Sequence, residues 1–416
     1  MAQVALDRGG LALPDNVPPE CVVDFDLYNL EGTEIDFDEP WRRLRDAARR
    51  CYGDGPPGLM WTPRNEGHWI AIRGSAAAEV LEDYERFSNT VIFVPKTVGI
   101  QHHMLPTNID VPEHQHYRRL INPGMSPRAV RGLTQTIREL SISLIESFEN
   151  KGECDFARDY ASQLPIALFM RLVDLPVEDA DKMKHWANQI LHGDGEMNYA
   201  EARGHFESYL NTFIEQRLKA PGDDMLSQII HGDIQGRPLT REEMLKFCTQ
   251  LMIAGLDTVI NLLNFIFVFL ARSPEHRRQL AQNPSMIPRA QEELFRRFSI
   301  VSTARVVQQD MDYGGVRLKQ GDMVLAPTPF IGTDEELYPD PFTVDFSRKP
   351  TFPHAVFGRG AHICAGANLA RAEIAITLEE WLKRIPEFEM VPGTQIAFTG
   401  GIVGTIDSMP LRWKTS

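Results

Sequence analysis

The segment Phe357-Gly358-Arg359-Gly360-Ala361-His362-Ile363-Cys364-Ala365-Gly366 decides how this sequence is interpreted. It places one cysteine in a glycine-rich loop, directly before an amphipathic stretch at 367–385 that favours a helix. Glycine has no Cβ, so the loop backbone can approach a flat ligand closely. A thiolate here would lie at the positive end of the helix, which favours its charge and lowers its pKa. We therefore predict that Cys364 is an axial metal ligand, and haem iron suits such sulfur ligation.

The spacing Phe-x-x-Gly-x-x-x-Cys-x-Gly is specific, because four residue types must coincide at Phe357, Gly360, Cys364 and Gly366. The alternative is an ordinary buried free cysteine in a loop before a helix. The segment resembles the haem-binding loop of the cytochrome P450 monooxygenases. That resemblance implies haem b as the cofactor, Cys364 as its metal ligand, and Phe357 and Gly366 as residues that contact it.

Composition restricts the class of protein further. The 416 residues carry 43 Lys and Arg against 57 Asp and Glu, a net charge of −14, which argues against a nucleic-acid partner. Five cysteines without C-x-x-C spacing argue against a zinc knuckle and against covalent haem attachment, and suit a reducing cytosol; they are Cys21, Cys51, Cys154, Cys248 and Cys364. The longest apolar run, 262–271, is too short to cross a bilayer. We expect a cytoplasmic monomer that does not bind membranes, with one catalytic domain over 1–416 and a flexible segment at 1–20.

Periodicity predicts a mostly α (α+β) protein with a small β-rich part. Short strand-like runs lie at 59–61 and 68–72, and helical periodicity dominates from 128 to 297. A strand is expected at 305–307, followed by a hairpin that pairs 315–318 with 322–325.

The longest predicted helix begins after Thr240, where Thr-Arg-Glu-Glu forms a capping box with Glu243, and ends at Ser273-Pro274. Roughly 32 residues span about 48 Å, enough to cross the molecule over a cofactor. Gly255 lies in its middle and costs about 1 kcal/mol relative to alanine, which close approach of a flat cofactor would explain. Thr258 can hydrogen-bond back to a carbonyl, and Asp257 can relay protons. A tolerated glycine beside a satisfied Asp-Thr pair is an equal alternative.

Haem b carries two propionates, which need cationic or hydrogen-bonding partners. By resemblance to the family, the candidates are His114, Arg118, Arg305 and His362, and the alternative for each is an ordinary surface charge. Glu293 and Arg296 match the family's structural Glu-x-x-Arg motif, although three-apart pairs are usually surface ion pairs.

The segment Gly255-Leu256-Asp257-Thr258-Val259 and several others resemble those of the bacterial camphor hydroxylase group. The resemblance implies that the residues facing the substrate are Phe93, His102, Met104, Thr107, Leu191, Gln250, Ile253, Val301, Ile402 and Val403. Ordinary core packing is the alternative for each aliphatic one. His102 stands where the camphor enzyme has a tyrosine that binds the substrate's ketone, and Gln250 stands where it has a leucine.

These features predict a haem-thiolate monooxygenase that hydroxylates a small cyclic terpenoid with dioxygen. A camphor-like monoterpenoid or an ionone-like norisoprenoid fits the pocket, and 1,8-cineole or a small aromatic compound is the alternative. The chain has no flavin or iron–sulfur domain, so the resemblance implies a [2Fe–2S] ferredoxin with an NADH-dependent reductase as the electron donor. The local positive charges available to dock it are Arg118, Arg119, Lys349 and Arg359. A peroxygenase without redox partners, or a haem sensor, remains open.

Overall fold

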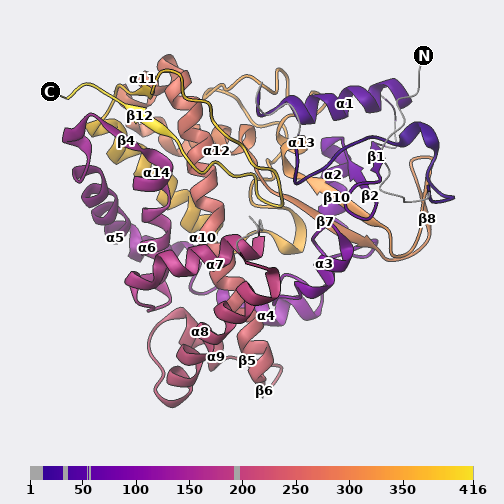
Figure 1. The fold of residues 1–416 in the computed structure, drawn as a ribbon, viewed down its shortest axis with the longest axis horizontal. Coiled ribbons are helices and arrows are strands. Elements are labelled where there is room, and N and C mark those ends of the chain that lie inside the picture. Colours follow the sequence, from indigo (N-terminus) through magenta and orange to yellow (C-terminus); the bar gives the residue numbers. More distant parts are fainter. Residues whose placement is uncertain (1–12, 31–35, 54, 56–57, 192–196, 416) are drawn as a thin grey trace.

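Helix α10 (Arg241–Arg272) runs through the middle of the molecule and organises the fold (Figure 1). The computed structural model describes residues 13–30, 36–53, 55, 58–191 and 197–415. The side chain of Thr240 accepts a hydrogen bond from the Glu243 backbone N–H, and the Glu243 carboxylate accepts one from the Thr240 backbone N–H. The predicted capping box and both helix ends are therefore confirmed. By length and composition α10 could cross a membrane, but 72% of its most apolar window is buried inside the protein, which is typical of a core helix.

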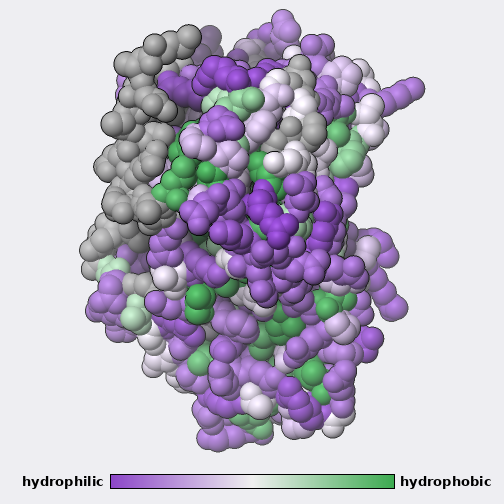
Figure 2. Space-filling model, turned by 90° about the vertical axis from the view of Figure 1, so that its right-hand side faces the viewer, coloured by the Kyte–Doolittle hydropathy of each residue, from purple (hydrophilic) through white to green (hydrophobic). Residues whose placement is uncertain are grey.

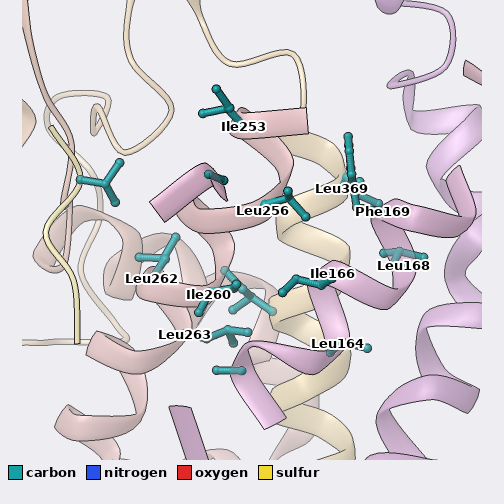
Figure 3. Packing of buried hydrophobic residues seen from close by; sticks show 14 of the residues in the cluster. Leu164, Ile166, Leu168, Phe169, Ile253, Leu256, Ile260, Leu262, Leu263 and Leu369 are labelled. Atoms are coloured by element: carbon teal, nitrogen blue, oxygen red, sulfur yellow. The ribbon is translucent and has the colours of Figure 1, made fainter. Parts of the chain in front are cut away.

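Most of the other helices surround α10 and bury their apolar faces against it or against one another. Figure 3 shows Leu164, Ile166 and Phe169 of α6 beside Leu256 and Ile260 of α10. The helices of this part are α4 (Glu113–Ile121), α5 (Pro127–Glu146), α6 (Gln163–Leu172), α7 (Ala180–Leu191), α8 (Tyr199–Lys219), α9 (Met225–Ile230), α11 (Pro274–Gln282), α12 (Ile287–Arg297) and α14 (Ala367–Arg384).

The larger β-sheet lies on the side of the molecule away from most of these helices, and its strand order is β1-β2-β10-β7-β3 (Figure 1). Its strands are β1 (Leu59–Thr62), β2 (His68–Ala71), β3 (Phe87–Ser88), β7 (Ser302–Val307) and β10 (Met323–Pro327), and only the β2–β10 pair is parallel. The helices of this part are α1 (Glu39–Tyr52), α2 (Gly74–Glu82), α3 (Lys96–Gln101) and α13 (Thr328–Gly332). Smaller sheets are formed by β4 (Glu153–Asp155) with β11 (Glu389–Met390) and β12 (Pro410–Arg412), and by β5 (Asp233–Ile234) with β6 (Arg237–Pro238). The mostly α fold class is confirmed.

The predicted hairpin between 315–318 and 322–325 is wrong, although both segments are strands. Strand β9 (Val316–Leu318) pairs instead with β8 (Met311–Tyr313) through the turn at Gly314-Gly315. Strand β10 is buried at every position, and it lies in the middle of the larger sheet between β2 and β7. Two adjacent glycines suit a tight hairpin turn, and a fully apolar strand gains more from a central position than from an edge.

The described surface is mainly polar. On the face that Figure 2 shows, apolar residues form small patches separated by polar side chains. Residues 1–12, the first part of the segment expected to be flexible, lie outside the described residues, whereas Val17 of the same segment is buried.

Candidate active site

A cavity of about 330 Å³ lies between α10 and the cysteine loop. The shape of the cysteine loop depends on its glycines. Gly358 and Gly360 have φ angles of +70° and +69°, which residues with a side chain rarely adopt. A Cβ on Gly360 would also lie 2.9 Å from the Cα of Glu82, at the end of α2. The predicted site residues that line the cavity are Thr107, His114, Arg118, Gln250, Gly255, Thr258, Val301, Arg305, Phe357, His362, Cys364 and Gly366.

Cys364 is held by the loop at the start of α14. Its N–H donates to the carbonyl of Phe357 at 2.7 Å, and Gly366 is the residue before the first turn of α14. The Phe357 ring packs edge-on against Phe295 at 5.3 Å and lies 4.5 Å from the guanidinium of Arg371. The sulfur therefore sits on a rigid support and faces the cavity.

Burial raises the pKa of the Cys364 thiol, whereas the backbone N–H groups of Gly366 and Ala367 and the charges of Arg118 and Arg371 lower it. The lowering from the helix end is present, as the sequence indicated. Burial outweighs it, so the expected net fall in the pKa of Cys364 is wrong. Coordination to a metal deprotonates a thiol and would hold Cys364 as the thiolate.

Three buried nitrogen atoms at the cavity have no partner among the described residues: His114 Nδ1, Arg305 Nε and His362 Nε2. The rings of His114 and His362 lie 4.0 Å apart. Burial lowers the pKa of His114 to about 4 and the pKa of Arg305 to about 10. Unpaired buried donors are costly, so this cluster is suited to hold an anion. Arg118 also lines the cavity, and one of its guanidinium N–H groups donates to the carbonyl of Ile363 at 2.9 Å.

The structure gives a different reason for the glycine at position 255 from the one that the sequence suggested. A Cβ on Gly255 would lie 2.5 Å from the ring of Phe169, so packing against α6 requires the glycine. Thr258 donates from its hydroxyl to the carbonyl of Ala254 at 3.2 Å, as predicted. Asp257 is buried outside the cavity lining, and its carboxylate accepts from the side chain of Asn261 at 2.8 Å.

The predicted substrate residues divide into groups. Thr107, Gln250 and Val301 line the cavity. His102, Met104 and Ile253 line a smaller neighbouring hollow, where the His102 ring stacks on Phe93 at 4.4 Å.

Ile402 and Val403 are buried in the core, and Val403 forms a β-bridge with Val301. The side chain of Leu191, at the end of α7, lies outside the described residues. The structure therefore brings three of the ten predicted residues to the main cavity.

Sequence reasoning missed Phe169 and Glu373, which also line the cavity. Glu373 follows Leu369 and Ala370 at helical spacing, so an acidic residue on an apolar stripe was the available signal. The Glu-x-x-Arg pair is buried rather than exposed, with Glu293 bound by two nitrogens of Arg296 at 2.8 Å each.

Known proteins match this chain over most of its length. The cytochrome P450 family model matches residues 169–399. A probable cytochrome P450 127A1 of Sinorhizobium fredii is 33% identical over 406 residues, covering 96% of this chain and 97% of that protein. The crystal structure of CYP101J2 is 42% identical with a TM-score of 0.88, covering 97% and 100% of the two chains. That of CYP101C1 is 36% identical with the same TM-score and coverage.

The chain belongs to the cytochrome P450 family, a class of monooxygenases whose cofactor is haem b. The family, the fold and the cofactor that the sequence indicated are thereby confirmed. The residues present fit haem b, because a cysteine faces the cavity from one loop and unpaired nitrogens at the cavity wall could donate to the two propionates.

Proposed function

We propose that this P450 hydroxylates a small cyclic terpenoid, camphor-like or ionone-like. The observation that carries the proposal is the wall that α10 forms on one side of the cavity, which is mainly apolar. The likeness of the segments around Gly255 and Ile402 to the camphor hydroxylase group supports the same substrate class.

The residues of the cavity would hold the cofactor in the way the sequence suggested. Cys364 would bind the iron as thiolate, and His114, Arg305 and His362 would donate to the propionates, with Arg118 beside the Cys364 loop. When bound, haem b supplies the dioxygen activation that inserts one oxygen atom into a C–H bond.

Thr258 and Asp257 would control the protons of the reaction. The Thr258 hydroxyl lies at the cavity, so it can donate a hydrogen bond there once it leaves the Ala254 carbonyl. Asp257 faces away toward Asn261, and it is close enough to Lys184 to favour the charged form of that amine. Asp257 would pass protons from outside the cavity to Thr258.

Electrons would come from a [2Fe–2S] ferredoxin and its NADH-dependent reductase, in the cytoplasm. Of the four predicted docking charges, Arg118 and Arg359 are engaged internally, since Arg359 pairs with Glu82. Arg119 and Lys349 are exposed and would form the docking charge of a monomeric enzyme.

An optical titration of the ferric holoenzyme with camphor, 1,8-cineole and an ionone tests the substrate class. A saturable shift of the haem to high spin is expected with at least one of them, because a bound substrate displaces water from the iron. If none shifts the spin state while the reduced protein with carbon monoxide gives a thiolate-type spectrum, the terpenoid assignment is wrong and the cofactor site stands.

A further inference from the structure

One face of α10 forms a wall of the cavity, and its residues recur three and four apart as a helical face requires. All but two of them are apolar or glycine: Phe247, Gln250, Leu251, Ala254, Gly255, Thr258, Val259 and Leu262. The polar exceptions are Gln250 and Thr258, two helical turns apart. This wall therefore offers an occupant two polar contacts separated by apolar surface.

The amide of Gln250 is uncommitted, because none of the described residues hydrogen-bonds to it. Two hydroxyls of the lining are engaged within the protein: the Thr258 hydroxyl donates to the carbonyl of Ala254, and the Thr328 hydroxyl donates to the carbonyl of Val301 at 2.7 Å. Gln250 is half-buried beside apolar walls, so an occupant that excludes water from the cavity leaves the amide without a partner unless the occupant itself hydrogen-bonds to it. An occupant that presents a hydrogen-bonding group to Gln250 would therefore bind more tightly than one that lacks it.

His102 is the rival anchor, since it stands where the camphor enzyme has its ketone-binding tyrosine. In this chain its ring stacks on Phe93 with an interplanar angle of 26°, and it lines the smaller hollow instead of the main cavity. The other rival is Thr107, which lines the cavity from the loop before α4. Gln250 differs from both in standing on a rigid, buried helix and in offering two donors.

We infer that Gln250 is the specificity-determining residue that anchors the carbonyl or ether oxygen of an otherwise hydrocarbon ring substrate. The inference rests on the proposed terpenoid function and names the substrate's required chemistry. Gln250 and Thr258 are eight residues apart, about 12 Å along the helix axis. A compact ring bound through its oxygen at Gln250 presents a remote carbon to the Thr258 end. Hydroxylation therefore falls on a carbon away from the oxygen.

The test compares camphor with camphane, the same skeleton without the carbonyl, in the ferric holoenzyme. Gln250→Met keeps the length of the side chain and removes both donors. Dissociation constants are taken from the spin-state shift and from calorimetry. The preference for camphor over camphane is expected to fall about tenfold in Gln250→Met, the worth of one neutral hydrogen bond. Leu251→Met reshapes the same wall without changing its polarity, so it should leave that preference intact.

An unchanged preference in Gln250→Met would overturn the inference while the terpenoid function stands. A fall in the preference with His102→Phe or Thr107→Val, and none with Gln250→Met, would likewise overturn it and move the anchor to that residue. If the wild type binds neither compound, nor any other terpenoid tried, the proposed function fails and the anchor fails with it.

Discussion

Glu373 is a buried acid whose replacement should stabilise the protein in a pH-dependent way. It lies on α14 at the cavity wall, is 3% exposed, and its Oε2 has no partner among the described residues. Burial raises its pKa to about 8 from the ordinary 4.5. The folded protein therefore keeps Glu373 protonated at neutral pH, whereas the unfolded chain ionises it. The stability that depends on this proton is complete below pH 4.5 and is lost as the pH rises toward 8.

The linkage between proton binding and folding gives the size of this change in stability. Each unit of difference between the pKa values of Glu373 in the folded and unfolded states is worth about 1.4 kcal/mol. The ionisation of Glu373 in the unfolded chain costs the protein about 1 kcal/mol of stability at pH 5.5 and about 4 to 5 kcal/mol at pH 8.5. Glu373→Gln keeps the shape and removes the titration. Relative to the wild type, the variant should therefore gain about 3 kcal/mol between these two pH values.

Urea unfolding of the holoenzyme at pH 5.5 and 8.5, followed by circular dichroism, measures this gain. Glu380→Gln is the matched control on the same helix. Glu380 is also buried, but Arg138 and Arg384 bind it, and its pKa is lowered by them despite burial. It should therefore destabilise the protein equally at both pH values. A difference between Glu373→Gln and the wild type that does not change with pH would show that Glu373 is ionised in the folded protein.

Three further predictions follow from the site and its surface. Thr258→Ala should keep haem and substrate binding but uncouple NADH consumption from product, with recovery in Thr258→Ser; full coupling in the alanine variant would exclude proton delivery by this hydroxyl. Gly255→Ala should cost about 1–3 kcal/mol in unfolding experiments, because its Cβ would lie 2.5 Å from the Phe169 ring; Phe169→Leu should restore part of that loss, and an unchanged stability would contradict this packing. Arg119→Glu with Lys349→Glu should slow reduction by ferredoxin at low salt and have little effect at high salt; a rate that does not respond to salt would place docking elsewhere.

Features that depend on neighbouring residues could be predicted from the sequence. The Thr240 and Glu243 capping box joins residues three apart, and the Thr258 hydroxyl bonds a carbonyl four residues earlier. The cysteine loop spans ten residues whose conformation is set by its own glycines. In each case the interacting groups lie within one or two turns of chain, so spacing alone specifies the contact.

Features that depend on distant partners could not be predicted in this way. The sequence showed that β9 and β10 are strands, but the partners of β10 are residues 69–70 and 302–306, which only the assembled sheet brings together. The sequence showed that a glycine in the middle of a helix requires an explanation, but not that the explanation is the ring of Phe169 on another helix. The direction of the pKa shift of Cys364 could not be predicted for the same reason, because the burial that raises this pKa depends on every element around the loop.

The substrate pocket lies between these two cases, and this explains why its prediction succeeded only in part. The resemblance placed Gln250 at the substrate, and helical periodicity explains why Gln250 shares one face of α10 with Thr258 at the cavity. His102 comes from the loop after α3, where no periodicity constrains the side chain, and it lies instead in the neighbouring hollow. Resemblance to the camphor enzyme indicated which position in the sequence corresponds to its substrate-binding tyrosine. It could not indicate how the side chain at that position packs in this protein. A change of anchor from the α3 loop to α10 therefore alters substrate preference while the fold, the cysteine loop and the cofactor site stay the same.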